Sequence, residues 1–265
     1  MKWYGALLIL TIAAIGSAHA QGAPTPEAVR DLAPNGRLRA AINFGNGVLV
    51  QKAADGKAMG VPDLAVALAK RLDVPVDFVT FPSAGQTFAA ATTGAWDIAF
   101  LAIDPVRAAE AEFGPPYVII HGAYLVRAAS AIRDMADVDK LGITIGVGQG
   151  SVYDLFLTRT LKMARLVRNP KGGAMGGIEP FTAQNLDGVA GVRDSLEGYV
   201  KDRPEVRLLP GSFQQIRQAI ATPKGRGAAS IAYLREFVET MKANGFVAEA
   251  LARSNQTASV APPGN

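Results

Sequence analysis

Short apolar runs and amphipathic segments alternate along this chain, and the alternation restricts its fold more than any other feature. Residues 38–43, 74–81 and 97–103 are predicted strands, because short apolar runs bounded by turn residues are typical of buried strands. Residues 62–72 lie between the first two and form a predicted helix, with three leucines at a four-residue spacing on one face. Strands that alternate with helices build mostly parallel sheets, so we expect an α/β fold.

The second half of the chain continues this pattern. We expect a strand at 123–127, strand candidates at 143–147, 165–168, 188–192 and 206–209, a strand crossing back at 213–221, and helix over 228–254 with a break at Asn244-Gly245. Residues 257–265 are rich in Pro, Ser and Gly, and we expect them to be disordered. The alternation alone fits one continuous sheet as well as two lobes.

The N-terminus has the three regions of a secretory signal peptide. Lys2 precedes an apolar run over residues 6–15, and Ala18-His19-Ala20 is a small-x-small cleavage site. The run is too short to span a membrane as a helix. We expect export, cleavage after Ala20 and a mature chain of residues 21–265, whose loss of Lys2 lowers the net charge from +4 to +3.

Composition excludes several classes of function. The chain has no cysteine, so it forms no disulfide, holds no thiolate metal site and lacks a lipidation cysteine. Its weak positive charge is scattered, without a basic run or a nucleic-acid motif. His121 is the one histidine of the mature chain, and no metal-ligand or Ser-His-Asp spacing surrounds it. We expect a periplasmic protein without metal, cofactor or nucleic-acid partner.

Arg107 is the first candidate site residue. Asp104 and Pro105 stop the strand at 97–103 and suit the cap and first position of a helix, which places Arg107 in the first helical turn. A cation is unfavourable beside the positive end of a helix dipole unless an anion completes the site. An alternative interpretation is a surface arginine that is solvated or paired with Glu110.

Two further candidates follow predicted strands. Ser151 comes after a glycine turn at 148–150, where strand, turn and helix start can form an anion site from backbone N–H groups. Ser151 with Asp154 is also a capping-box pattern, and both roles are compatible. The turn lacks the lysine of a phosphate-binding loop and the third glycine of a dinucleotide turn. Asp194 follows the strand at 188–192, where it could bind an ammonium or cap the next helix.

The residues around Arg107 resemble a known family. Residues 103–107 (IDPVR) and 113–117 (FGPPY) resemble the Thr-x-x-Arg and Phe-Ser-x-Pro-Tyr segments of extracellular solute-binding proteins of the amino-acid ABC transporter type, family 3, with Asp for Thr and Gly for Ser. The resemblance implies a type II periplasmic-binding fold: two lobes, each a mixed sheet flanked by helices, with two crossing strands as the hinge. It implies a discontinuous first lobe, residues 21–124 and 220–256, and a second lobe, residues 125–219.

The resemblance also implies site roles. Arg107 would clamp a ligand carboxylate, Gly150 and Ser151 would meet it from the second lobe, and Asp194 would bind an α-ammonium. In the first lobe, Asn43, Phe44, Ala102 and Asp104 are ligand-binding candidates, although the loop after Asn43 departs from the family pattern and favours a core role for Phe44. The expected protein is a monomeric component of an ABC importer that closes on a small carboxylate and then meets an inner-membrane permease.

Two other functions stay open from sequence. Some relatives are similar to cyclohexadienyl dehydratases, which need a general acid in the cleft, and Glu179 and Asp194 are the acids we nominate. A ligand sensor that signals to a membrane partner in trans is the second alternative.

Overall fold

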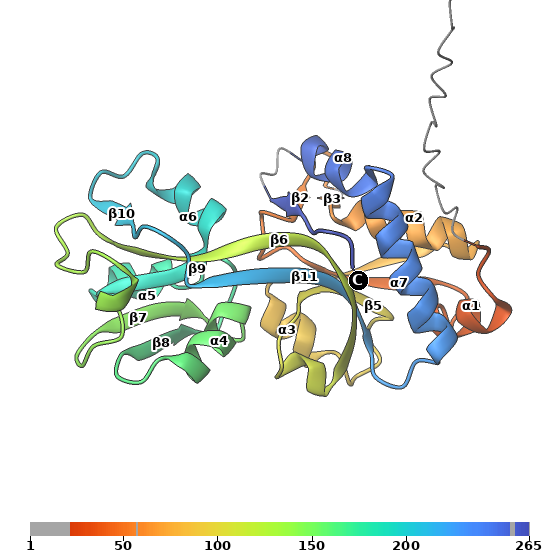
Figure 1. Cartoon of the computed structure of the whole chain (residues 1–265), viewed down its shortest axis with the longest axis horizontal. Helices are drawn as coiled ribbons and strands as arrows, with labels where there is room; N and C mark the ends of the chain where they lie inside the picture. Colours follow the sequence, from red (N-terminus) through yellow and green to blue (C-terminus); the bar gives the residue numbers. More distant parts are fainter. Residues whose placement is uncertain (1–21, 57, 255–257, 265) are drawn as a thin grey trace, which may run out of the picture.

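The computed structural model describes residues 22–56, 58–254 and 258–264. The predicted signal peptide, residues 1–20, lies outside the described residues. Two lobes lie end to end and are connected by two long strands, β6 and β11 (Figure 1). None of the helices in the described ranges combines the length and the apolar character that crossing a membrane requires.

The first lobe contains a sheet with helices on both sides. Its parallel strands are β4 (Val76–Phe81), β1 (Leu38–Asn43) and β5 (Ile98–Ala102), in that order, and β11 (Gln214–Pro223) pairs antiparallel with β5. The other elements of this lobe are the helices α1 (Pro26–Leu32), α2 (Pro62–Leu72), α3 (Ala84–Ala89), α7 (Ala228–Ala243) and α8 (Phe246–Arg253) and the hairpin of β2 (Val50–Lys52) and β3 (Ala58–Gly60).

The second lobe repeats this arrangement on a smaller scale. Strand β7 (Thr144–Gly148) pairs in parallel with β8 (Arg165–Asn169) and β9 (Gly188–Val192). Strand β9 then pairs antiparallel with β6 (Ala111–Arg127). The remaining elements are β10 (Val206–Leu208), also on β6, and the helices α4 (Val152–Thr160), α5 (Ile178–Ala183) and α6 (Arg193–Val200).

Strand β6 belongs to both lobes, because its first part pairs with β11 and its last part with β9 and β10. The β6–β11 register shifts between Gln218 and Ala221, on the first-lobe side. Two crossing strands give the predicted mixed sheet and hinge. The division of the lobes at 124/125 and 219/220 falls inside these strands and remains a proposal.

The predicted amphipathic helix at 62–72 is helix α2, and Leu64, Leu68 and Leu72 are all buried in the main core. The strands at 188–192 and 38–43 also form as predicted. The break at Asn244-Gly245 separates α7 from α8, where Gly245 adopts a positive φ of 83°. Local apolar spacing and a glycine therefore predicted these elements correctly.

The helix that we expected after Asp104 is wrong. Arg107–Ala109 forms a single 3₁₀ turn, because β6 begins at Ala111 and leaves no room for a helix. Asp104 does not cap this turn, whose N-cap residue is Val106 without a side-chain cap bond; Asp104 Oδ1 instead accepts from the N–H of Val106 at 2.8 Å, just before the turn. The helix-dipole argument for Arg107 therefore does not apply.

The expectation of a disordered tail is also wrong for residues 258–264. Strand β12 (Ser259–Val260) pairs antiparallel with β6 at Ile119 and Val118, on the edge that β11 leaves open. Ala261 is buried and donates its N–H to Tyr117 O at 3.0 Å. Unpaired backbone groups on an edge strand explain why this short apolar stretch is ordered.

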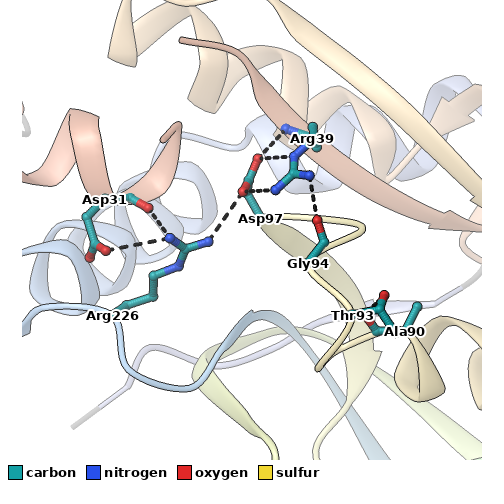
Figure 2. A network of polar contacts seen from close by, with 7 residues as sticks. All are labelled: Asp31, Arg39, Ala90, Thr93, Gly94, Asp97 and Arg226. Carbon is teal, nitrogen blue, oxygen red and sulfur yellow. Dashed lines mark hydrogen bonds and ion pairs between the residues drawn. The ribbon is translucent and has the colours of Figure 1, made fainter. Parts of the chain in front are cut away.

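A buried ion-pair network lies at the amino ends of β1 and β5 in the first lobe (Figure 2). The Asp97 carboxylate, fully buried just before β5, accepts from the backbone N–H of Arg39 at 2.9 Å and from its Nη2 at 2.8 Å. Arg226 donates to Asp97 Oδ1 at 3.3 Å and also pairs with Asp31 of α1. The network thus ties α1, β1, β5 and the segment before α7 together.

Candidate functional site

A cavity lies between the lobes at the carboxyl ends of their parallel strands. Asn43 and Ala102 end β1 and β5 in the first lobe, Val192 ends β9 in the second, and all three line the cavity. This edge is where open α/β sheets bind ligands. The cavity is small: its volume, measured as the space that the centres of water molecules can occupy, is about 40 Å³, so it has room for only a few water molecules.

Glycines bring the two lobes into close contact beside this cavity. The N–H of Ala174 donates to Gly45 O at 2.7 Å, across the gap between the lobes. A Cβ atom on Gly85 would lie 2.9 Å from Gln149 O and 3.2 Å from Gly150 Cα. The described conformation is therefore a closed one, and its closeness depends on the absence of side chains at these positions.

Arg107 is buried at the centre of this contact, with 1% of its surface exposed. Its Nη1 donates to Ala102 O of the first lobe at 3.1 Å, and its Nη2 donates to Gly150 O of the second lobe at 3.0 Å. Its buried Nε has no hydrogen-bond partner among the described residues. Arg107 lines the cavity, so this unpartnered donor belongs to the site.

The charge of Arg107 is only partly compensated. Burial lowers the pKa of Arg107 to about 10, and the nearby Asp104 carboxylate opposes that shift. Asp104 is itself buried and pairs with Arg159 of α4, Nη2 to Oδ2 at 2.7 Å, across the lobes. Two cations thus share one carboxylate, and a bound anion would complete the charge balance.

The glycine turn before α4 is held from within the second lobe. Ser151 caps α4, its Oγ accepting from the N–H of Asp154 at 3.1 Å, and it also lines the cavity. The predicted cap is therefore confirmed. The reciprocal bond of a capping box is shifted by one residue, because Asp154 Oδ2 accepts from the N–H of Gly150 at 2.9 Å. Gly150, with a φ of 70°, needs the conformational freedom of glycine there.

The structure brings together four of the eight predicted site residues: Asn43, Ala102, Arg107 and Ser151 line the cavity. Gly150 and Asp104 do not line the cavity. Gly150 O accepts a hydrogen bond from Arg107, and Asp104 pairs with Arg159. The backbone carbonyl of Ala102, one of the ligand-binding candidates, accepts from Arg107.

Phe44 and Asp194 lie outside the cavity lining. Phe44 packs against the main core, in line with the core role that the loop sequence favoured. Asp194 lies in the first turn of α6, which begins one residue before it, and it is half-buried. Glu179, the other acid nominated for catalysis, is exposed and accepts from Asn169 at 3.0 Å.

Besides Asn46, in the loop after the predicted Asn43, the cavity lining has four polar residues that sequence reasoning missed: Ser83, Gln149, Tyr153 and Gln218. Ser83 follows β4 and caps α3, so the rule that ligands meet strand ends could have found it. Tyr153 donates from its hydroxyl to Gly173 O at 2.7 Å, and burial raises its pKa. Gln218 lies on β11, where no local pattern distinguishes it from its neighbours.

Within the described ranges, no group of His, Asp and Glu residues could hold a metal ion. His121 lies on β6 and is half-buried. The chemistry of the cavity is therefore that of one arginine, several neutral polar groups and an apolar wall.

The sequence profile of the bacterial extracellular solute-binding proteins, family 3, matches residues 50–255. No curated protein sequence gives a significant match.

Solved structures of such proteins share the fold. The solute receptor for L-cysteine of Neisseria gonorrhoeae is 21% identical, with a TM-score of 0.72 over 85% of this chain and 92% of that one. The substrate-binding protein AbpA of an amino acid ABC transporter from Streptococcus pneumoniae, bound to L-arginine, is 21% identical, with a TM-score of 0.70 over 84% and 96%. The ancestral amino acid-binding protein AncCDT-1, a precursor of cyclohexadienyl dehydratase, is 21% identical, with a TM-score of 0.70 over 86% and 98%.

Proposed function

This chain belongs to family 3 of the bacterial extracellular solute-binding proteins, and from that premise we propose that it is the periplasmic component of an ABC importer that closes on a small carboxylate. The observation that carries the proposal is the buried Arg107, which lines the interlobe cavity and retains an Nε donor without a partner among the described residues. A planar guanidinium fits a carboxylate better than any other side chain does.

Hinge closure is the mechanism. Each lobe supplies part of the cavity wall, so a ligand that contacts both walls binds the closed state more tightly and shifts the population toward it. The closed form then presents a surface made by both lobes to an inner-membrane permease. The predicted signal peptide, with cleavage after Ala20, would deliver the protein to the periplasm as a monomer.

The proposed protein binds its ligand and does not convert it. A dehydratase needs a general acid beside its substrate. Glu179 and Asp194 do not line the cavity, and Arg107 is the one charged residue among the described residues that do. Chromatography of ligand recovered after long incubation with the protein tests this directly, because an enzyme would convert it and a binding protein would return it unchanged.

The clamp is tested by binding. Purified protein of residues 21–265 is screened against small carboxylates by thermal shift, and affinity is measured by calorimetry. A bound ligand stabilises the folded state, so the melting temperature rises. Arg107→Ala should weaken binding at least tenfold, since losing one partner of a buried charge pair costs about 2–5 kcal/mol.

Arg37→Ala is the matched control, because Arg37 pairs with Asp77 on the surface of the first lobe. This variant should bind as the unmodified protein does. Unchanged affinity in Arg107→Ala, with the control also unchanged, would exclude Arg107 as the clamp.

A further inference from the structure

The described residues that line the cavity between the lobes include a cation and no anion. Arg107 is the one charged side chain among its lining residues in the described part of the chain. The polar members of the lining are otherwise neutral: Asn43, Asn46, Ser83, Gln149, Ser151, Tyr153 and Gln218. A ligand therefore meets a cation and neutral dipoles from these residues, and it meets no carboxylate among them.

The acids near the cavity are committed to other cations. Asp104 pairs with Arg159 at 2.7 Å, and Asp154 pairs with Arg168 at 2.9 Å while also accepting from Gly150 N–H. Asp194 lies in the first turn of α6 and outside the lining. An ammonium group that entered the cavity would have to leave water without a carboxylate to receive it.

Backbone carbonyls around the cavity already accept hydrogen bonds. Ala102 O and Gly150 O accept from Arg107, and Gly173 O accepts from Tyr153. Val192, at the carboxyl end of β9 in the second lobe, contributes an apolar residue to the cavity lining. A buried ammonium beside Arg107 would thus face a like charge and only neutral acceptors, such as Asn46 Oδ1, which has no hydrogen-bond partner among the described residues. Without a carboxylate among the described lining residues, burying that second cation is unfavourable.

We infer that the ligand is a small carboxylate without an ammonium group: an unsubstituted, 2-hydroxy or 2-oxo acid with a short apolar remainder. The inference rests on the proposed function, because it assumes that Arg107 holds the carboxylate. The remainder would lie against the apolar part of the lining, including Phe100, Ile120 and Val192. The cavity in this closed conformation has room for only a few water molecules, which favours a short remainder.

Matched acids test the inference with the protein of residues 21–265. L-alanine is compared with L-lactate, pyruvate and propionate, and L-leucine with 2-hydroxyisocaproate and isocaproate, by calorimetry and thermal shift. Within each set the carbon skeleton is constant and the substituent at C2 is the variable: amino, hydroxy, oxo or hydrogen. We expect the best acid without an ammonium to bind at least tenfold more tightly than the amino acid.

A second variant turns the inference into a gain of function. Val192 is the N-cap residue of α6 and lacks a side-chain cap bond, so Asp, a favourable N-cap residue, is compatible with the local backbone. Val192→Asp should shift the preference toward the amino acid at least tenfold by adding a carboxylate to the cavity. Val192→Asn has nearly the same shape without the charge, and it should not cause that shift.

The outcomes separate the two proposals. If amino acids bind more tightly than their deaminated counterparts, and Arg107→Ala abolishes that binding, the clamp stands and this inference is overturned. If no acid of either kind binds, the proposed function falls, and the inference falls with it. Preference for the acids without ammonium, reversed by Val192→Asp and not by Val192→Asn, supports both.

Discussion

Arg107 donates from Nη2 to the backbone carbonyl of Gly150 over 3.0 Å, a hydrogen bond that joins one lobe to the other. The same guanidinium donates from Nη1 to Ala102 O within its own lobe. Opening the hinge would break the Gly150 bond and return the cation to water. Under the proposed function, lobe closure and ligand binding would be coupled through this one side chain, because closure buries a charge that a bound anion would stabilise.

The contact between Gly85 and Gly150 limits how close the lobes can come. A methyl group on Gly85 would meet Gln149 O at 2.9 Å and Gly150 Cα at 3.2 Å. Gly85→Ala should therefore hold the lobes apart and weaken ligand affinity about tenfold, which corresponds to about 1.4 kcal/mol. Calorimetry gives the affinity, and small-angle scattering of the ligand-saturated protein should show a larger radius of gyration.

Gly198→Ala is the control for this variant. Gly198 lies in α6, and a methyl group there would have no atom of another described segment within 4 Å, so alanine adds no contact. This control should keep full affinity. Equal affinities for the two variants would show that the glycine contact does not limit closure.

The Arg159–Asp104 pair is the ion pair that we expect to report on closure. Asp104 is 2% exposed, and its partner comes from α4 of the second lobe at 2.7 Å. Arg159→Met removes the ion-pair partner that the second lobe supplies to the buried Asp104 carboxylate and leaves only Arg107, among the described residues, to balance its charge. Because this partner is lost from the closed state, ligand affinity should fall several-fold to tenfold. Titrations with ligand at low salt measure the effect.

Arg253→Met is the matched variant, because Arg253 pairs with Asp63 inside the first lobe at 2.8 Å. Its affinity should equal that of the unmodified protein. A loss of affinity in both variants, in place of Arg159→Met alone, would argue against a role of the interlobe pair in closure.

The Asp97 network of Figure 2 should determine the stability of the first lobe. Asp97 is fully buried and pairs with Arg39 and Arg226. Asp97→Asn leaves these arginines without their anion, and we expect a loss of about 2–4 kcal/mol in the free energy of unfolding. Urea denaturation followed by circular dichroism measures it.

Asp77→Asn provides the comparison for the network. Asp77 pairs with Arg37 at the surface, and both side chains are close to half exposed. Hydrogen bonding to Arg37 lowers the pKa of Asp77, but exposed pairs contribute little to stability. We expect no measurable change in the urea midpoint, and comparable losses in both variants would contradict the special role of the buried network.

The C-terminal residues 258–264 should stabilise the crossing strand β6. They supply β12, the buried Ala261, and the Pro262 carbonyl that accepts from Lys242 Nζ at 2.8 Å. A chain that ends at residue 257 should lose about 1–3 kcal/mol of stability through these lost contacts. A chain that ends at Gly264 retains them and should melt like the full chain, whereas equal melting of both would show that the tail contributes nothing.

The sequence by itself determined the α/β class and most of the helices and strands, and it singled out Arg107 and Ser151, which line the cavity. These conclusions depend on local patterns: apolar periodicity predicted helix α2 and strand β9, and glycine at 245 predicted the break between α7 and α8. A strand that ends in a polar turn is also a local signal, and it led to Arg107 and Ser151.

Only the tertiary structure decided which residues share the cavity. Gln218 of β11 and Tyr153 of α4 line it because two lobes from distant parts of the chain close on each other, and no local pattern encodes that contact. The pairing of Asp104 with Arg159, the position of Asp194 outside the lining and the pairing of β12 with β6 have the same cause. Each is set by long-range packing and charge pairing, whose energy depends on distances in space and leaves no trace in sequence spacing.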